Sequence, residues 1–423
     1  MPVQGKIDIL SCRSSEEIRN SLFSVLESYQ DILPSSRKAS ILIKPNLNSN
    51  MNALTGNTTD LRILSAIVRY LKRQGYSNIT IGEGTNSGFY RSRISVISRL
   101  RVDALAAHYH VDVIDLNSAD LTDVPFRNGV TAQVARVCVE SDFFINVPKL
   151  KTHFEVGMSV CLKSLIGCLV GQTNKKKTHL NLAANIICLN DAIRPHLQIV
   201  DGLIAMEGCG PSRGTPVRLD TIIVGSDPYL IDLACSRIAG FDYRDIATLK
   251  LAEENNRLTD DHHRYVQAMD LSGIQRHFKP PVVNPFAAFI HHPNRQKYFS
   301  AVRNTPFFSY LASTEWFGNI LYRTGLRQDV LSMTEMTLNH LSLNAERCKQ
   351  CGICSLVCPL YTDLPAALSL VSRPCIQCMY CYMVCPESAI IFDGTPGFLI
   401  EQFKEYDHII RNLYVERNDI KQP

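Results

Sequence analysis

The feature that most constrains this chain is a cysteine phrase that occurs twice near its C-terminal end. The first copy is Cys348-x2-Cys351-x2-Cys354-x3-Cys358-Pro359, and each of its cysteines recurs 27 positions later in a second copy. A tight loop with three thiolates can bind three corners of an iron–sulphur cube, while the fourth corner needs a ligand from elsewhere. The duplication therefore predicts two [4Fe–4S] clusters and an electron-transfer role.

The fourth cysteine of each copy is expected to serve the other cluster, as in two-cluster bacterial ferredoxins, whose cysteine runs have this spacing. Structural zinc sites and disulfides are the alternatives. Zinc modules usually separate two Cys-x2-Cys pairs by a longer stretch, so clusters are favoured. The predicted ligands are Cys348, Cys351, Cys354 and Cys385 for one cluster, and Cys375, Cys378, Cys381 and Cys358 for the other.

Length and composition predict a multi-domain protein of the reducing cytoplasm. A chain of 423 residues with 45% apolar and 20% charged residues has ample material for two or three domains. A net charge of +4 is too small to favour a nucleic-acid partner. The first residues lack the pattern of a signal peptide, and no apolar run is long enough to span a bilayer. The seven cysteines outside the two copies are scattered, without paired spacing.

Residues 1–245 are predicted to form an α/β domain with a mainly parallel, doubly wound sheet. Helical periodicity from Ser14 to Tyr29 and from 61 to 74 alternates with short apolar runs. Strands separated by helices are typical of a parallel sheet covered on both faces. The predicted strands are 39–44, 78–82, 111–116, 143–147, 197–200 and 221–224.

Three further segments follow. Residues 246–340 are predicted to be a helical connector, 341–393 a small α+β ferredoxin-like domain, and 394–423 a short closing tail. The connector has eleven aromatic residues between Phe278 and Tyr322, among several basic ones. Rings packed into a core are the favoured interpretation, and contact with a membrane surface or partner is the alternative.

A ligand of a doubly wound sheet binds beyond the carboxyl ends of its strands. Polar residues with Gly or Pro follow five of the predicted strands, at 44–46, 83–85, 146–153, 201–211 and 225–228. Between 149 and 179 there are six lysines and two histidines against one acid, Glu155, which favours an anionic or nucleotide-like ligand. The predicted ligand-binding residues are Lys44, Asn46, Lys149, Lys151, His153 and Lys163.

Other residues in this region have alternative interpretations. Lys175–Lys177 are expected to be a solvated loop, and Cys161 and Cys168 buried structural thiols. Cys209, in a glycine-rich turn, is a weaker redox candidate. Asp201 and Glu207 are candidates for proton handling, although loop capping by carboxylates is favoured for both. The usual NAD and ATP sequence signatures do not occur.

Five motifs in order resemble the domain of unknown function 362 family, whose members often carry a C-terminal two-cluster ferredoxin module. They are IKPNLN (43–48), NVPKLKTH (146–153), KSLIGC (163–168), DGLIAMEGCGPSRG (201–214) and GSDPYLID (225–232). The resemblance covers about residues 5–245 and 341–393. It implies an iron–sulphur protein with a redox role, but the family supplies no settled reaction.

The leading functional prediction is a cytoplasmic oxidoreductase whose clusters exchange electrons with an anionic ligand at the sheet edge and with a redox partner protein. Two alternatives remain open. One is a non-enzymatic electron-transfer or maturation subunit, and the other is an anion-binding sensor whose clusters report redox state.

Overall fold

The α/β domain is built on one large sheet. The computed structural model describes residues 5–281, 305–314, 316–317, 320, 332–369 and 374–415. Within this part the sheet has nine strands, seven of them in the order β1-β11-β10-β7-β2-β3-β4. Five of these seven strands run parallel to one another, as the sequence predicts. They are β2 (Ile41–Pro45), β3 (Ile79–Glu83), β4 (Asp112–Asp115), β7 (Phe143–Val147) and β10 (Leu197–Glu207).

One side of the sheet departs from the predicted parallel pattern. β11 (Thr215–Gly225) pairs antiparallel with β10, and β1 (Ile7–Ser11) pairs antiparallel with β11. The segment 225–228, expected at the ligand edge, therefore lies at the opposite end of the sheet. The error arose because a buried antiparallel strand and a buried parallel one have the same apolar sequence pattern.

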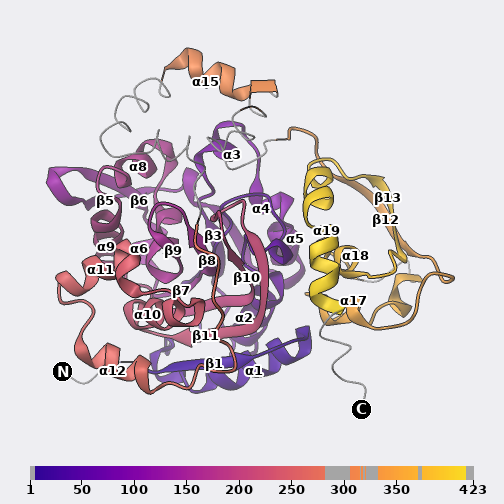
Figure 1. The fold of residues 1–423 in the computed structure, drawn as a ribbon, viewed down its shortest axis with the longest axis horizontal. Helices are drawn as coiled ribbons and strands as arrows, with labels where there is room; N and C mark the ends of the chain where they lie inside the picture. The colour runs from indigo at the N-terminus through magenta and orange to yellow at the C-terminus, as the bar shows by residue number, and fades with distance from the viewer. Residues whose placement is uncertain are drawn as a thin grey trace.

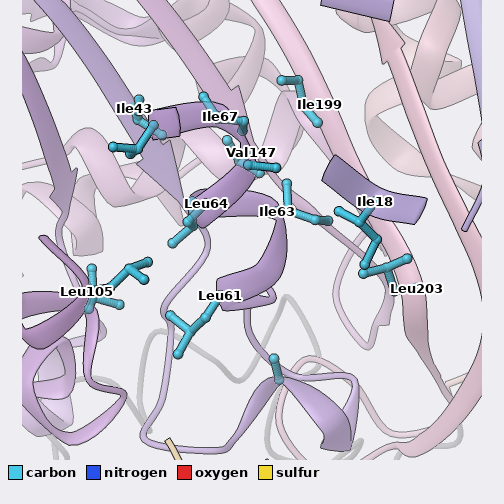
Figure 2. Packing of buried hydrophobic residues seen from close by; sticks show 14 of the residues in the cluster. Ile18, Ile43, Leu61, Ile63, Leu64, Ile67, Leu105, Val147, Ile199 and Leu203 are labelled. Atoms are coloured by element: carbon cyan, nitrogen blue, oxygen red, sulfur yellow. The ribbon is translucent and has the colours of Figure 1, made fainter. Parts of the chain in front are cut away.

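Helices cover both faces of the sheet. α1 (Ser15–Glu27), α2 (Leu61–Arg73) and α5 (Val102–Tyr109) pack on one face, where Figure 2 shows Ile63 and Ile67 beside Ile43 and Val147. The other face carries α7 (Cys161–Ser164), α9 (Leu182–Ile193), α10 (Pro228–Ala239), α11 (Ala247–Glu254) and α12 (Asp260–Ala268). Alternating strand residues supply the two cores, since Ile199 faces the first and Val200 the second.

Local sequence determines where the two N-terminal helices begin. Ser14 caps α1 by accepting a hydrogen bond from the Glu17 amide at 3.1 Å, and Asp60 caps α2 through the Arg62 amide at 2.9 Å. Shorter elements complete the domain: α3 (Ser87–Arg91), α4 (Val96–Arg99), β5 (Leu121–Pro125), β6 (Thr131–Ala135), α6 (Val137–Glu140), β8 (Lys149–His153), β9 (Gly157–Ser159) and α8 (Gly171–Thr178).

The C-terminal module packs against the α/β domain. Its antiparallel strands β12 (Thr337–Leu343) and β13 (Ile390–Thr395) lie on the outer side, with α17 (Ile353–Leu356) and α18 (Tyr380–Val384) below them (Figure 1). The tail after 394 is more than the short closing segment expected. It contains α19 (Leu399–Val415), which lies between the module and the sheet domain and buries Tyr406, Ile410 and Tyr414 in the core around α2.

The connector is described only in part. Phe278 is buried, as expected for core packing, but Phe307 and Tyr310 on α15 (Pro306–Ser313) and nearby Trp316 are exposed, so the core interpretation is wrong for these three. Five of the other aromatic residues lie outside the described residues: Phe286, Phe289, Tyr298, Phe299 and Tyr322. Among the described helices, none has the length and apolar character needed to cross a membrane.

Candidate functional site

Electrostatic interactions connect cysteines of the two copies. The pKa of Cys354 is raised to about 11, first by burial and then by nearby Cys351 and Cys385. The pKa of Cys381 is also raised, first by burial and then by nearby Cys375, Cys358 and Cys354. Cys385 therefore lies near Cys351 and Cys354, and Cys358 lies near Cys375 and Cys381, while the division into two sets of cluster ligands stays a prediction. No three His, Cys, Asp or Glu side chains in the described residues converge as ligands of one metal ion.

The backbone repeats the duplication that the sequence shows. Gln350 and Gln377 have φ of 53° and 57°, and Gly352 and Met379 have φ of 73° and 65°, each pair 27 positions apart. The helices α17 and α18 begin with the same offset. A left-handed residue inside a turn directs successive amide groups inward, a concavity found at many iron–sulphur sites. Both loops therefore fit an anionic cluster bound by thiolates.

The cysteine loops contact the segment that follows β2, at the carboxyl edge of the sheet. The Asn52 side chain donates to the Cys378 carbonyl at 3.0 Å, and the Leu61 amide donates to the Tyr380 hydroxyl at 3.2 Å. A small pocket between them is lined by both sides, including Thr58, Cys378 and Tyr380. The candidate ligand edge and the second cysteine loop are thus direct neighbours.

A buried charge network lies behind this contact. Lys149 on β8 donates to Asp201 on β10 at 2.9 Å, and Asp201 also accepts from the Asp60 amide at 2.7 Å. Asp60 binds the Arg62 guanidinium at 2.7 Å, and Arg62 reaches the Leu356 carbonyl in the first cysteine run at 3.3 Å. All four charged side chains of this network are at most 2% exposed. The two positive and two negative charges of the network balance, so Lys149 is already paired with protein groups.

Lys44 and Lys151 are also held by protein acceptors. Lys44 binds Glu83 at 3.1 Å and the Ser164 hydroxyl at 3.2 Å. A Cβ added at Gly167 would come within 1.9 Å of Glu83, so only glycine fits beside that pair. Lys151 donates to Asn46 at 2.9 Å, to Asn48 at 2.5 Å and to the Asn57 carbonyl at 2.7 Å.

Lys175 was expected in a solvated loop, and that expectation is wrong. It lies on α8 and is buried, donating to the Gly84, Thr85 and Asn117 oxygens at 2.6–2.9 Å. Burial lowers its pKa to about 8. Lys176 on the same helix is exposed, as expected, whereas Lys177 is half-buried and donates to the Thr131 carbonyl at 2.7 Å. The helical turn directs one lysine of the run inward, which a run of like charges does not reveal.

Lys163 and His153 differ from the other predicted ligand residues. In the described part of the chain, Lys163 has no hydrogen-bond acceptor or ion-pair partner, and burial lowers its pKa to about 8. His153 accepts the Glu155 amide at Nδ1, at 3.2 Å. Burial lowers the pKa of His153, and nearby Lys163, His179 and Lys151 lower it further. A neutral ring with Nδ1 as acceptor carries its proton on Nε2. Both side chains are therefore donors at the sheet edge.

The proposed acid–base residues are held apart. Asp201 is bound by Lys149, whereas Glu207 binds Lys279 at 3.2 Å and accepts its amide at 2.9 Å. Both carboxylates also accept backbone amides, which matches the capping interpretation. Cys161 and Cys168 are buried, as expected, and Cys209 is half-buried.

Sequence reasoning missed Asp60, Arg62 and Asn57, which complete the network around the lysines. The N-cap position of Asp60 could have been predicted from the sequence, because an aspartate directly before an apolar helical pattern is a typical N-cap. Arg62 and Asn57 had no such signal, since nothing in their neighbourhood indicates burial against a distant strand.

Comparison with known proteins agrees with this architecture. Residues 41–237 match the family described as "Domain of unknown function (DUF362)", and residues 340–386 match a "4Fe-4S dicluster domain". A thylakoid-associated protein of Synechocystis sp. is 29% identical over 154 residues, which are 33% of this chain and 48% of that protein. This chain therefore spans about half the length of that curated relative.

The lactate racemase apoprotein from Thermoanaerobacterium thermosaccharolyticum aligns with a TM-score of 0.38 at 13% identity, over 55% of this chain and 56% of that one. A likeness of this size carries no argument about function. The two family matches, by contrast, identify a chain that joins a DUF362 domain to a dicluster iron–sulphur domain.

Proposed function

We propose that this chain, which joins a DUF362 domain to a dicluster domain, is an iron–sulphur oxidoreductase acting on an anionic ligand at the sheet's carboxyl edge. When bound, [4Fe–4S] clusters supply one-electron transfer. The contact between Asn52 and the Cys378 carbonyl carries the proposal, because it brings the segment after β2 against a cysteine loop. A reducing cytoplasm as location is part of the same proposal.

The ligand would bind through Lys163 and His153. Lys44, Lys149 and Lys151 spend their hydrogen bonds on protein acceptors. The charge of Lys163 lowers the pKa of His153, and an anion between the two side chains would offset that effect. A donor-only pair selects an acceptor such as a carboxylate or phosphate.

The test begins with anaerobic purification and mass spectrometry of any small molecule that copurifies. The affinity of that molecule is then measured for wild type, Lys163→Met and Lys176→Met. One charge-assisted contact is worth roughly 1.5–3 kcal/mol, so Lys163→Met should weaken binding about ten- to a hundredfold. Lys176 is exposed on α8 and serves as the matched control. Equal affinities in all three proteins would refute the site.

A non-enzymatic electron-transfer or maturation subunit is the second candidate. It is favoured by the separation of Asp201 and Glu207, each of which is held by its own lysine. An enzyme of this kind would need another proton donor, and the Nε2 of His153 is the group available at the edge. Turnover of the copurified molecule with a chemical reductant distinguishes the two, because a carrier subunit would bind it without converting it.

A further inference from the structure

The two cysteine loops are chemically equivalent but lie in different surroundings. In the first loop Lys349, Gln350 and Cys351 are all exposed. Their counterparts 27 positions later are less exposed, since Ile376 is buried and Gln377 and Cys378 are half-buried. The loops share their backbone conformation, so the difference comes from what packs against each one.

The second loop is covered by the α/β domain. Arg101 donates to the Gln377 side chain at 3.1 Å, and Asn52 donates to the Cys378 carbonyl at 3.0 Å. Ile376 belongs to the core that surrounds α2, whereas its counterpart Lys349 is exposed. Only its first cysteine, Cys375, is exposed. This loop is directed at the proposed ligand edge.

The hydrogen bonds and the ion pair described for the first loop, residues 346–351, lie within its own module. The Glu346 and Arg347 amides donate to Asn344 at 3.0 and 3.2 Å, and Lys349 forms an ion pair with Glu387 at 2.6 Å. Within the described residues, no side chain of the α/β domain bonds to this loop. A cluster bound by Cys351 therefore has a thin, polar covering on the solvent side.

We infer that loop 346–351 is the docking surface for a one-electron carrier protein, while the loop at 376–380 faces the ligand. In each encounter the carrier would lose one electron, which a cluster held by Cys348, Cys351, Cys354 and Cys385 would take up, with no bond made or broken. The ligand-facing part rests on the proposed function. The docking part does not, because it follows from the exposure of one loop alone.

A charge-reversal experiment tests the docking surface. Lys349→Glu is compared with Lys404→Glu, a matched control on α19: the two lysines are 72% and 67% exposed, and each pairs with a glutamate. Such exposed pairs contribute little to stability, so both variants should fold. The probe is a small reduced ferredoxin, and stopped-flow absorbance gives its bimolecular rate of electron transfer to the holoprotein.

At low salt, Lys349→Glu should change the bimolecular rate of electron transfer at least about threefold, and this change should disappear at high salt. The rate for Lys404→Glu should equal that of wild type. An unchanged rate for Lys349→Glu, or an equal effect in both variants, would overturn the docking surface.

A second measurement tests the orientation of the two loops. Cys351→Ser and Cys378→Ser each disturb one cluster, and a dysprosium chelate in solution reports how near the remaining cluster is to solvent. The chelate should relax the reduced-cluster paramagnetic resonance signal more in Cys378→Ser than in Cys351→Ser. The reverse order would overturn the inference. Neither experiment involves the ligand, so failure here is separate from failure of the proposed function.

Discussion

Replacing Lys149 with methionine should destabilise the α/β domain, although the sequence suggests that this lysine contacts a ligand. Lys149 and Asp201 are both 0% exposed, and their atoms lie 2.9 Å apart. Methionine keeps the length of the side chain but leaves the Asp201 carboxylate buried without its cation. Breaking a buried ion pair on one side typically costs about 3–5 kcal/mol. A loss of that size lowers the melting temperature by roughly 10 °C in a domain of this length.

The assay is thermal unfolding of the anaerobic protein, followed by far-ultraviolet circular dichroism. Lys279→Met is the control, because Lys279 also pairs with a carboxylate of β10, Glu207, but is 75% exposed. An exposed pair is worth about 0–1 kcal/mol, so this variant should melt close to wild type. The double variant Lys149→Met with Asp201→Asn removes both buried charges and should recover part of the loss.

The reasoning is refuted if Lys149→Met melts like Lys279→Met while its ligand affinity falls. Lys149 would then be a ligand contact, as the sequence suggests, and the ion pair with Asp201 would contribute nothing to folding. A large loss of stability without recovery in the double variant would instead mean that methionine disrupts packing around β8.

Three further predictions follow from the described contacts. The anaerobic protein should contain about eight iron and eight acid-labile sulphide per chain, which elemental analysis checks, and stoichiometric zinc without sulphide would contradict this. Cys358→Ser should damage the cluster of Cys375, Cys378 and Cys381 rather than that of its own triplet, which paramagnetic resonance checks. Burial lowers the pKa of Lys163 to about 8, so anion affinity should be constant below pH 8 and fall above it as the ammonium loses its proton. Lys163→Met should show no such fall, and titration calorimetry across this pH range measures both affinities. Gly167→Ala places a Cβ within 1.9 Å of the Glu83 carboxylate and should lower the melting temperature, while Gly171→Ala, with open space around it but a positive φ, should cost less.

The sequence predicted the parallel strands because each is a short apolar run between helical patterns. The crossed grouping of cysteines, which follows from a spacing that leaves each triplet one ligand short, stays a prediction. The sequence could not predict β1 and β11 as antiparallel neighbours of β10, because pairing direction depends on tertiary connections that a strand's own residues do not encode. The same limit applies to α19, whose buried tyrosines gave no sign that they pack against the sheet domain.

The lysines at the sheet edge show why the site itself was only partly predictable. Lys149 and Lys151 were predicted to bind a ligand, and both reach the segment after β2, at Ala53 and Asn57. Protein oxygens supply the acceptors that the sequence analysis assigned to a ligand. A carbonyl and a bound anion satisfy an ammonium group in the same way, so residue spacing cannot tell one from the other.

Lys163 is distinguished from its neighbours by what surrounds it rather than by its sequence. It lies on a short helix beside the Lys44–Glu83 pair, where Ser164, the next residue, already bonds to Lys44. Glu83 is already engaged by Lys44 and by the amides of Leu47 and Gly84, and no hydrogen bond joins it to Lys163 in the described residues. Lys163 is then a cation that the fold partly buries without supplying an acceptor from its described residues. Burying such a charge costs free energy unless the charge is paired. An anionic ligand bound at this position would supply the missing partner for Lys163.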